Sequence, residues 1–133
     1  MPNFRFATLP FRALWSARDQ WKADPSVLAA LGSVLLQKQR PQDALQFFTR
    51  AAAIEPLSTE YTFEYAVALQ ALGNAPGAIE KLQTVISADP AFQEAYVLLI
   101  HIYRDLGKRE QARQIIDSYL RIMPQSLTFR MLP

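Results

Sequence analysis

Few residues in this chain are of the types that carry out chemistry, and they lie far apart in the sequence. The chain has one histidine, His101, and no cysteine. Protein zinc sites combine several His, Cys, Asp and Glu ligands, and a catalytic triad needs a histidine oriented beside its nucleophile. Because no second histidine and no cysteine can join His101, we predict no metal site, no cofactor and no triad.

The other candidates for catalysis are also isolated. Ser33 and Ser118 fall within helical patterns, not at a sharp turn that presents a nucleophilic serine. The glycines are scattered singly, so no phosphate-binding loop is predicted. Four of the aspartates, Asp43, Asp89, Asp105 and Asp117, fall at expected turns and helix surfaces without pairing for acid–base work. We therefore predict that the chain is not an enzyme.

Charge and hydropathy exclude two further classes of partner. The 14 basic and 12 acidic residues leave a net charge of +2, and no run of like charges indicates nucleic-acid binding. No apolar stretch reaches about 18 residues, so we predict no membrane insertion. Arg5 and Arg12 interrupt the apolar residues at the start, which is therefore not a secretion signal. We expect a cytoplasmic protein, or a periplasmic one if the chain is a mature or excised fragment, and segments such as Ala88-Asp89-Pro90 suit a bacterial repeat protein.

A repeat with a period of 34 residues organises most of the chain. Proline, alanine and a large apolar residue each recur at this step, and two glycines share it. The positions are Pro56, Pro90 and Pro124; Ala44, Ala78 and Ala112; Phe48, Leu82 and Ile116; and Gly73 and Gly107. Agreement of several residue types on one period indicates a tandem-repeat protein.

Each repeat has the pattern of two helices joined by a tight turn. In the second repeat, apolar residues at helical spacing occur over 61–72 and again over 78–86. Gly73 between them can take the left-handed conformation that ends a helix, and Pro90 stops the second helix. The first repeat has Gln39-Arg40-Pro41 at this turn. We expect the alanine position to require a small residue because the two helices of a repeat cross closely there. We expect the bulky residue to fill the space between neighbouring repeats.

These motifs resemble the tetratricopeptide repeat family, whose 34-residue unit reads W-x₂-L-G-x₂-Y, then A-x₃-F, then P. The first repeat carries Leu28-x₂-Leu31-Gly32-x₂-Leu35, Ala44-x₃-Phe48 and Pro56. The third carries Tyr96-x₂-Leu99-Ile100-x₂-Tyr103, Ala112-x₃-Ile116 and Pro124, and the second departs most, with Thr62 and Ala66 at the tryptophan and glycine places. The resemblance covers residues 25–124. It implies an all-α fold, a right-handed superhelical stack of helix-turn-helix repeats (an α-solenoid) of about seven helices.

The period divides the chain into repeats at 24–57, 58–91 and 92–125, between two ends of other character. Residues 1–23 contain one further expected helix, from Pro10 to Lys22, which is either a degenerate half-repeat or a cap. Residues 126–133 form a tail or partial cap, in which one short turn could lie over Ile115, Tyr119 and Ile122. Four of the aromatic residues at the ends are candidate end-face contacts and would permit a homodimer; they are Phe11, Trp15, Trp21 and Phe129.

The resemblance also implies a binding surface, because the first helix of each tetratricopeptide unit lines the concave face of the stack. The candidate groove residues are Ser26, Ala29, Ser33, Leu36 and Gln37; Glu60, Phe63, Val67, Gln70 and Ala71; and Glu94, Val97, His101, Arg104 and Asp105. This surface suits an extended peptide or a helix with an apolar centre and a polar end. Phe63 is the expected anchor, unless it packs against the neighbouring helix.

The function predicted from these features is protein–protein interaction, as an adaptor or scaffold that holds a segment of a partner protein in the groove. Two alternatives remain open. The chain could be a structural or regulatory repeat segment of a larger multidomain protein, or it could associate with itself through its end faces.

Overall fold

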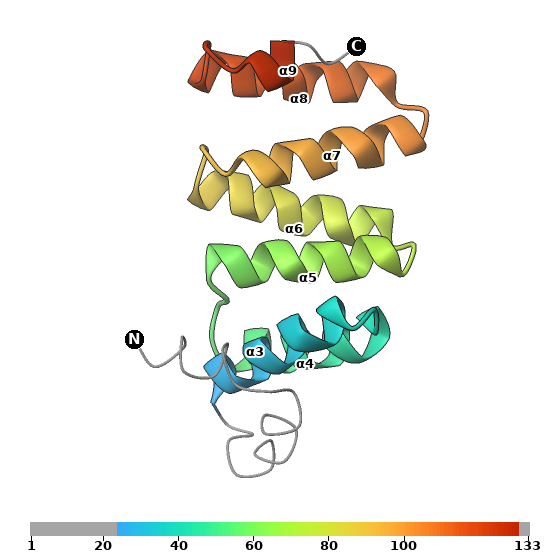
Figure 1. Ribbon diagram of the computed structural model, residues 1–133, viewed down its shortest axis with the longest axis vertical. Coiled ribbons are helices and arrows are strands. Elements are labelled where there is room, and N and C mark those ends of the chain that lie inside the picture. Colours follow the sequence, from blue (N-terminus) through green and yellow to red (C-terminus); the bar gives the residue numbers. More distant parts are fainter. Residues whose placement is uncertain (1–23, 131–133) are drawn as a thin grey trace.

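The computed structural model describes residues 24–130 and, within them, consists of helices and short connections (Figure 1). This confirms the predicted all-α stack of helix-turn-helix units. The predicted helix from Pro10 to Lys22 lies outside the described residues. The helices are α3 (Pro25–Gln37), α4 (Pro41–Ile54), α5 (Thr59–Ala71), α6 (Ala75–Ala88), α7 (Gln93–Asp105), α8 (Arg109–Ile122) and α9 (Leu127–Arg130).

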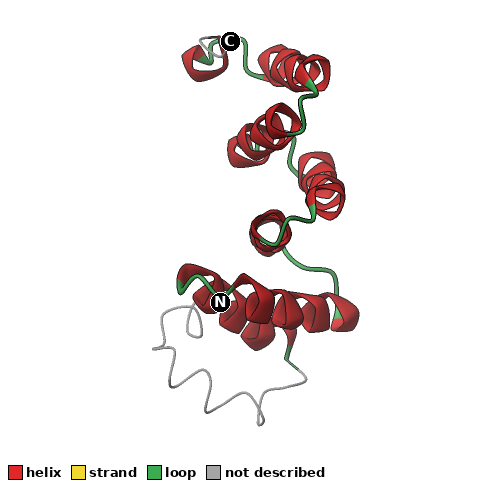
Figure 2. Ribbon diagram, turned by 90° about the vertical axis from the view of Figure 1, so that its right-hand side faces the viewer, coloured by secondary structure: helices red, strands yellow, loops and turns green. Residues whose placement is uncertain are grey.

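The helices after the first pair form two rows. Figure 2 shows α5 and α7 on one side of the stack and α6 and α8 on the other, with the short α9 on the side of α5 and α7. The pair α3–α4 runs across this view and is turned relative to the later pairs. The most extensive packing joins α3 to α4, α5 to α6 and α7 to α8, and α3 also contacts α5. The first helices of the second and third repeats, α5 and α7, therefore lie on one side of the stack, and α3 contacts α5.

Side-chain caps and prolines mark where several helices begin. Asp24 accepts a hydrogen bond from the Ser26 backbone N–H at 2.9 Å, and Asn74 accepts one from the Gly77 N–H at 3.0 Å. Such caps satisfy N–H groups that have no partner within the helix. Pro41 occupies the first turn of α4, as expected, where its missing N–H breaks no helical hydrogen bond.

The turn inside each repeat has the same backbone geometry, although its residue differs. Gln39, Gly73 and Gly107 have φ values of 59°, 81° and 73°. The residue after each one donates its backbone N–H to the carbonyl five positions earlier, at 2.9 Å, 2.9 Å and 2.7 Å. This is the hydrogen bond of a Schellman helix ending, which favours glycine in the left-handed position. Gln39 therefore adopts a conformation that costs a residue with a Cβ atom some strain.

We expect the substitution Gln39→Gly to raise the free energy of unfolding by about 0.5–1 kcal/mol, because glycine adopts a positive φ without the steric penalty. Urea unfolding followed by circular dichroism measures the change. Gln46→Gly, at an exposed position inside α4, is the matched control, and there glycine should lower stability by about 1 kcal/mol. Equal losses in both variants would contradict the strain at Gln39.

The repeated small and large residues form the core. Ala44, Ala78 and Ala112 are buried, as expected for the small residue that recurs in each repeat. Phe48 and Leu82 are fully buried, and Phe48 stacks against Tyr65 of the next repeat with ring centroids 5.9 Å apart. The large residue of the first repeat therefore joins neighbouring repeats, as the sequence predicted.

The last described segment is a single helical turn packed on the third repeat. The Phe129 side chain is fully buried, and its ring stacks on Tyr119 at 4.1 Å and meets Tyr96 edge-on at 6.4 Å. A short turn over Tyr119 was expected here, and Phe129 was also named as a possible end-face contact; its ring is enclosed by these two tyrosines and is not exposed at the end face. The other end-face candidates, Phe11, Trp15 and Trp21, lie outside the described residues.

Candidate functional site

The predicted groove residues lie on α3, α5 and α7, and nearly all keep contact with solvent. We use "the groove" for the surface formed by these three helices. The half-buried members are Ser26, Ser33, Leu36, Phe63, Val67, Gln70, Val97 and Arg104, and the exposed ones are Gln37, Glu60, Ala71, Glu94, His101 and Asp105. Ala29 is the exception, since it is 1% exposed, and its assignment to the groove surface is corrected.

A cavity of about 290 Å³ opens between α5 and α7, near the middle of the groove. Its lining is mostly apolar, with polar groups along one side. It consists of Phe63, Val67, Gln93, Glu94, Val97, Leu98 and His101. The structure thus brings together residues predicted from two repeats, and it adds Gln93 and Leu98, which the sequence reasoning missed.

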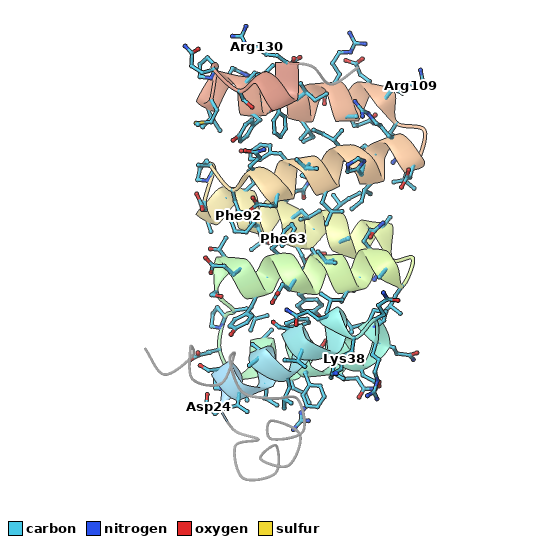
Figure 3. The ribbon with its side chains drawn as sticks, viewed as in Figure 1. Asp24, Lys38, Phe63, Phe92, Arg109 and Arg130 are labelled. Carbon is cyan, nitrogen blue, oxygen red and sulfur yellow. The ribbon has the colours of Figure 1, made fainter. Side chains whose placement is uncertain are left out.

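Phe63 packs against a neighbouring segment and also lines the cavity. Its ring lies 5.3 Å from that of Phe92, at an interplanar angle of 41°, and Figure 3 shows the two side chains meeting between α5 and α7. The same residue lines the cavity. Phe92, which precedes α7, therefore holds the ring that forms one wall. In the sequence, an aromatic residue directly before an expected helix was the feature that could have indicated this packing role of Phe92.

At the boundary of α3 and α5, a carboxylate lies beside the groove. The Ser33 hydroxyl donates a hydrogen bond to Oε2 of Glu64, which joins the two helices. Burial raises the pKa of the Glu64 carboxyl, the hydrogen bond from Ser33 lowers it, and the charge of Glu60 raises it. The net pKa is raised, because desolvation disfavours the charged form. Ser33 was predicted for the groove, whereas Glu64 was missed.

A second cavity, of about 310 Å³, lies at the other end of the groove, where α7 turns into α8. It is lined by Arg104, Arg109, Ala112 and Arg113, so its walls are basic. Arg109 is labelled at this end of α8 in Figure 3. Arg104 was a predicted groove residue, while Arg109 and Arg113 belong to a second helix and were not. The junction of α3 and α5 thus carries the acidic residues Glu60 and Glu64, whereas the turn from α7 to α8 carries Arg104, Arg109 and Arg113.

The described residues contain neither a candidate metal site nor a candidate membrane-spanning helix. Among residues 24–130, no group of three or more His, Asp or Glu side chains lies close enough to hold a metal ion. No helix in the same range is long and apolar enough to cross a membrane.

Family models of helical repeats match most of the chain, in agreement with the stacked helix pairs of the structure. Two family models, both described as tetratricopeptide repeat, match residues 12–59 and 69–132. The chain belongs to the tetratricopeptide repeat family. Modules of this family generally mediate protein–protein interaction, and they typically have no catalytic role of their own.

Two curated relatives are much longer than the matched repeats. The human protein O-mannosyl-transferase TMTC1 is 28% identical over 99 residues, which are 74% of this chain and 11% of that protein. The Arabidopsis thaliana TPR repeat-containing thioredoxin TTL4 is 28% identical over 92 residues, which are 69% of this chain and 14% of that protein. The tetratricopeptide chain thus spans a small fraction of the length of these relatives.

Solved structures share the fold. A crystal structure of MamA superposes with a TM-score of 0.80 at 20% identity, covering 90% of this chain and 70% of that one. A tetratricopeptide repeat protein from Parabacteroides merdae gives a TM-score of 0.78 at 22% identity, covering 91% of this chain and 48% of that one. At these identities the likeness establishes the helical stack alone.

Proposed function

We propose that this tetratricopeptide chain binds a segment of a partner protein in the groove, with one apolar side chain of that segment inserted between α5 and α7. The observation that carries the proposal is the cavity lined by Phe63, Val67, Val97 and Leu98. Apolar side chains that line an open cavity favour an apolar occupant, because their contact with water is then removed.

The size of the cavity indicates what kind of occupant it suits. Sites for small molecules usually enclose about 300–1,000 Å³ and surround most of the ligand. At about 290 Å³ and open to solvent, this cavity is at the small end of that range. It fits a single side chain of a longer segment better than a whole cofactor. Glu94 and His101 at its side would then meet the polar flank of that segment.

We expect Val67→Glu to weaken partner binding tenfold or more while the helical fold remains, because a carboxylate in the wall would be desolvated by an apolar occupant. Val67 is a better test than Phe63, whose removal would also break the packing on Phe92. Affinity capture with the full chain, followed by direct titration of the captured protein, measures the effect. Gln83→Glu, at an exposed position of α6 in the opposite row, is the matched control.

Two outcomes would contradict the groove proposal. One is equal titration curves for wild type and Val67→Glu at unchanged helicity and melting temperature. The other is an equal loss of binding in Gln83→Glu, which would place the interaction on the other row of helices.

A second candidate, a repeat segment that serves a larger protein, is supported by the curated relatives. In those proteins the matched repeats make up 11% and 14% of the length. In this case the occupant of the groove would be another part of the same polypeptide, and the binding constant of the isolated chain for free proteins would be weak. The same titration therefore distinguishes the two.

A further inference from the structure

We propose that Glu64 binds a lysine or arginine side chain of the segment in the groove, next to the apolar side chain held between α5 and α7. This inference rests on the proposed function and assigns the chemistry of the partner: a segment that places a basic residue beside a large apolar one.

The first support is the position of the Glu64 carboxylate. It lies at the junction of α3 and α5, half-buried, with the Ser33 hydroxyl as its hydrogen-bond donor. A carboxylate can accept several hydrogen bonds through its two oxygens, so one hydroxyl leaves capacity for a further donor. Ser33 is itself a groove residue and Glu64 is only half-buried, so the carboxylate lies next to the groove and part of its side chain remains accessible.

The second support is the absence of a positive charge on the two helices that enclose it. The α3 sequence, PSVLAALGSVLLQ, contains no charged residue. The α5 sequence, TEYTFEYAVALQA, contains Glu60 and Glu64 and no basic residue. The charge of Glu60 raises the pKa of Glu64 and the Ser33 hydroxyl lowers it, and the charge of Glu64 in turn raises the pKa of the Tyr61 phenol. A partly desolvated carboxylate beside a second carboxylate is most readily stabilised by a cation from outside.

The third support is the arrangement of Phe63 and Glu64 on α5. They are adjacent in sequence, so their side chains diverge by about 100° around the helix axis. Phe63 faces α7 and lines the apolar cavity, whereas Glu64 faces α3 and meets Ser33. A segment lying over α5 would meet an apolar site on one edge and an acidic site on the other.

The other roles of a glutamate do not account for this position. Glu64 lies in the middle of α5 and does not cap its first turn, whose cap is Ser58. Within residues 24–130, Arg40 and Asp43 form an ion pair at 2.7 Å, and Glu64 is not part of it. Because burial raises its pKa, its ionised form is held in the folded chain at a cost to stability. Binding of a cation would offset that cost.

The test selects ligands for the full chain from a displayed library of random 12-residue peptides, in parallel on wild type, Glu64→Lys and Glu80→Lys. Wild type should enrich peptides with Lys or Arg at a constant spacing from a large apolar residue. Glu64→Lys should lose that basic preference, and a selected peptide should bind it at least tenfold more weakly. Glu80→Lys carries the same charge change on an exposed site of α6 and should select as wild type does.

A further variant separates a binding role from a structural one. In Glu64→Gln the Ser33 hydrogen bond can persist, and peptide affinity should fall severalfold. Because the pKa of Glu64 is raised, the folded state favours the protonated carboxyl. The stability that this carboxyl contributes is therefore present at low pH and is lost as the pH rises through the folded-state pKa. Glu64→Gln should therefore melt no lower than wild type at pH 7, whereas a structural carboxylate would leave the variant less stable.

The possible failures can be told apart. Peptides with an apolar anchor but no basic position, or the same basic preference on Glu64→Lys, would overturn this inference and leave the groove in place. Absence of any enriched peptide on wild type, or equal binding of the selected peptides to Val67→Glu, would overturn the groove proposal and this inference with it.

Discussion

Replacing Phe48 by alanine should lower the free energy of unfolding by about 3–5 kcal/mol, as expected for removal of a fully buried aromatic ring from a packed core. The ring fills the space at Gly32, where an added Cβ atom would lie 3.0 Å from two of its carbons. It also stacks on Tyr65 of the following repeat. The loss should therefore include both the contacts within the first repeat and those that join it to the second.

Urea unfolding of the full chain, followed by circular dichroism, measures this loss. Gln46→Ala, at an exposed site on the same helix, should change the free energy of unfolding by less than about 0.5 kcal/mol. Phe48→Leu should fall between the two, since it retains part of the buried volume. A loss below about 1 kcal/mol in Phe48→Ala would show that the core of the first repeat can close over the missing ring.

The second large effect is expected at the other end of the stack, where Phe129→Ala should destabilise the third repeat by about 3 kcal/mol. Its buried ring contacts Tyr96 on the first helix of that repeat and Tyr119 on the second. Because each unit of a repeat stack contacts its neighbours alone, the effect should be local. The amide hydrogens of α8 should lose protection, while those of α3 and α4 should keep theirs.

Hydrogen exchange resolved by residue distinguishes this local opening from global unfolding. Gln125→Ala, exposed in the connection before α9, is the control and should leave the exchange of α8 unchanged. Uniform loss of protection across all helices in Phe129→Ala would contradict the expected independence of the first repeat. Unchanged exchange in α8 would show that α9 contributes no stability to it.

The sequence was most informative where a feature recurs with the period. Ala44, Ala78 and Ala112 occupy equivalent helix crossings, and a side chain that must be small at one crossing must be small at the next. Phe48 and Leu82 were placed in the core for the same reason. The first helices were also recognisable, and with them most of the residues that line the apolar cavity.

Features that break the period could not be predicted in this way. Glu64 follows Phe63 in a helix rich in aromatic residues, and its relation to Ser33 depends on the angle between two repeats, which no local pattern determines. Arg109 and Arg113 join Arg104 through the turn between α7 and α8, so a search of first helices alone could not find them. The sequence allowed a short turn over Tyr119, but it did not determine that the Phe129 ring would be enclosed between Tyr119 and Tyr96.

The succession of contacts along the stack also determines how the chain reaches this structure. Each helix packs mainly against the helices that precede and follow it in the chain. The contact between α3 and α5 skips one helix but still joins neighbouring repeats. Little loop entropy is lost before such contacts form, and proteins of low contact order fold in microseconds to milliseconds. Any helical hairpin can start the process, and the next hairpin then adds to it. Substitutions at opposite ends of the stack should therefore change the route by which the chain folds more readily than its rate.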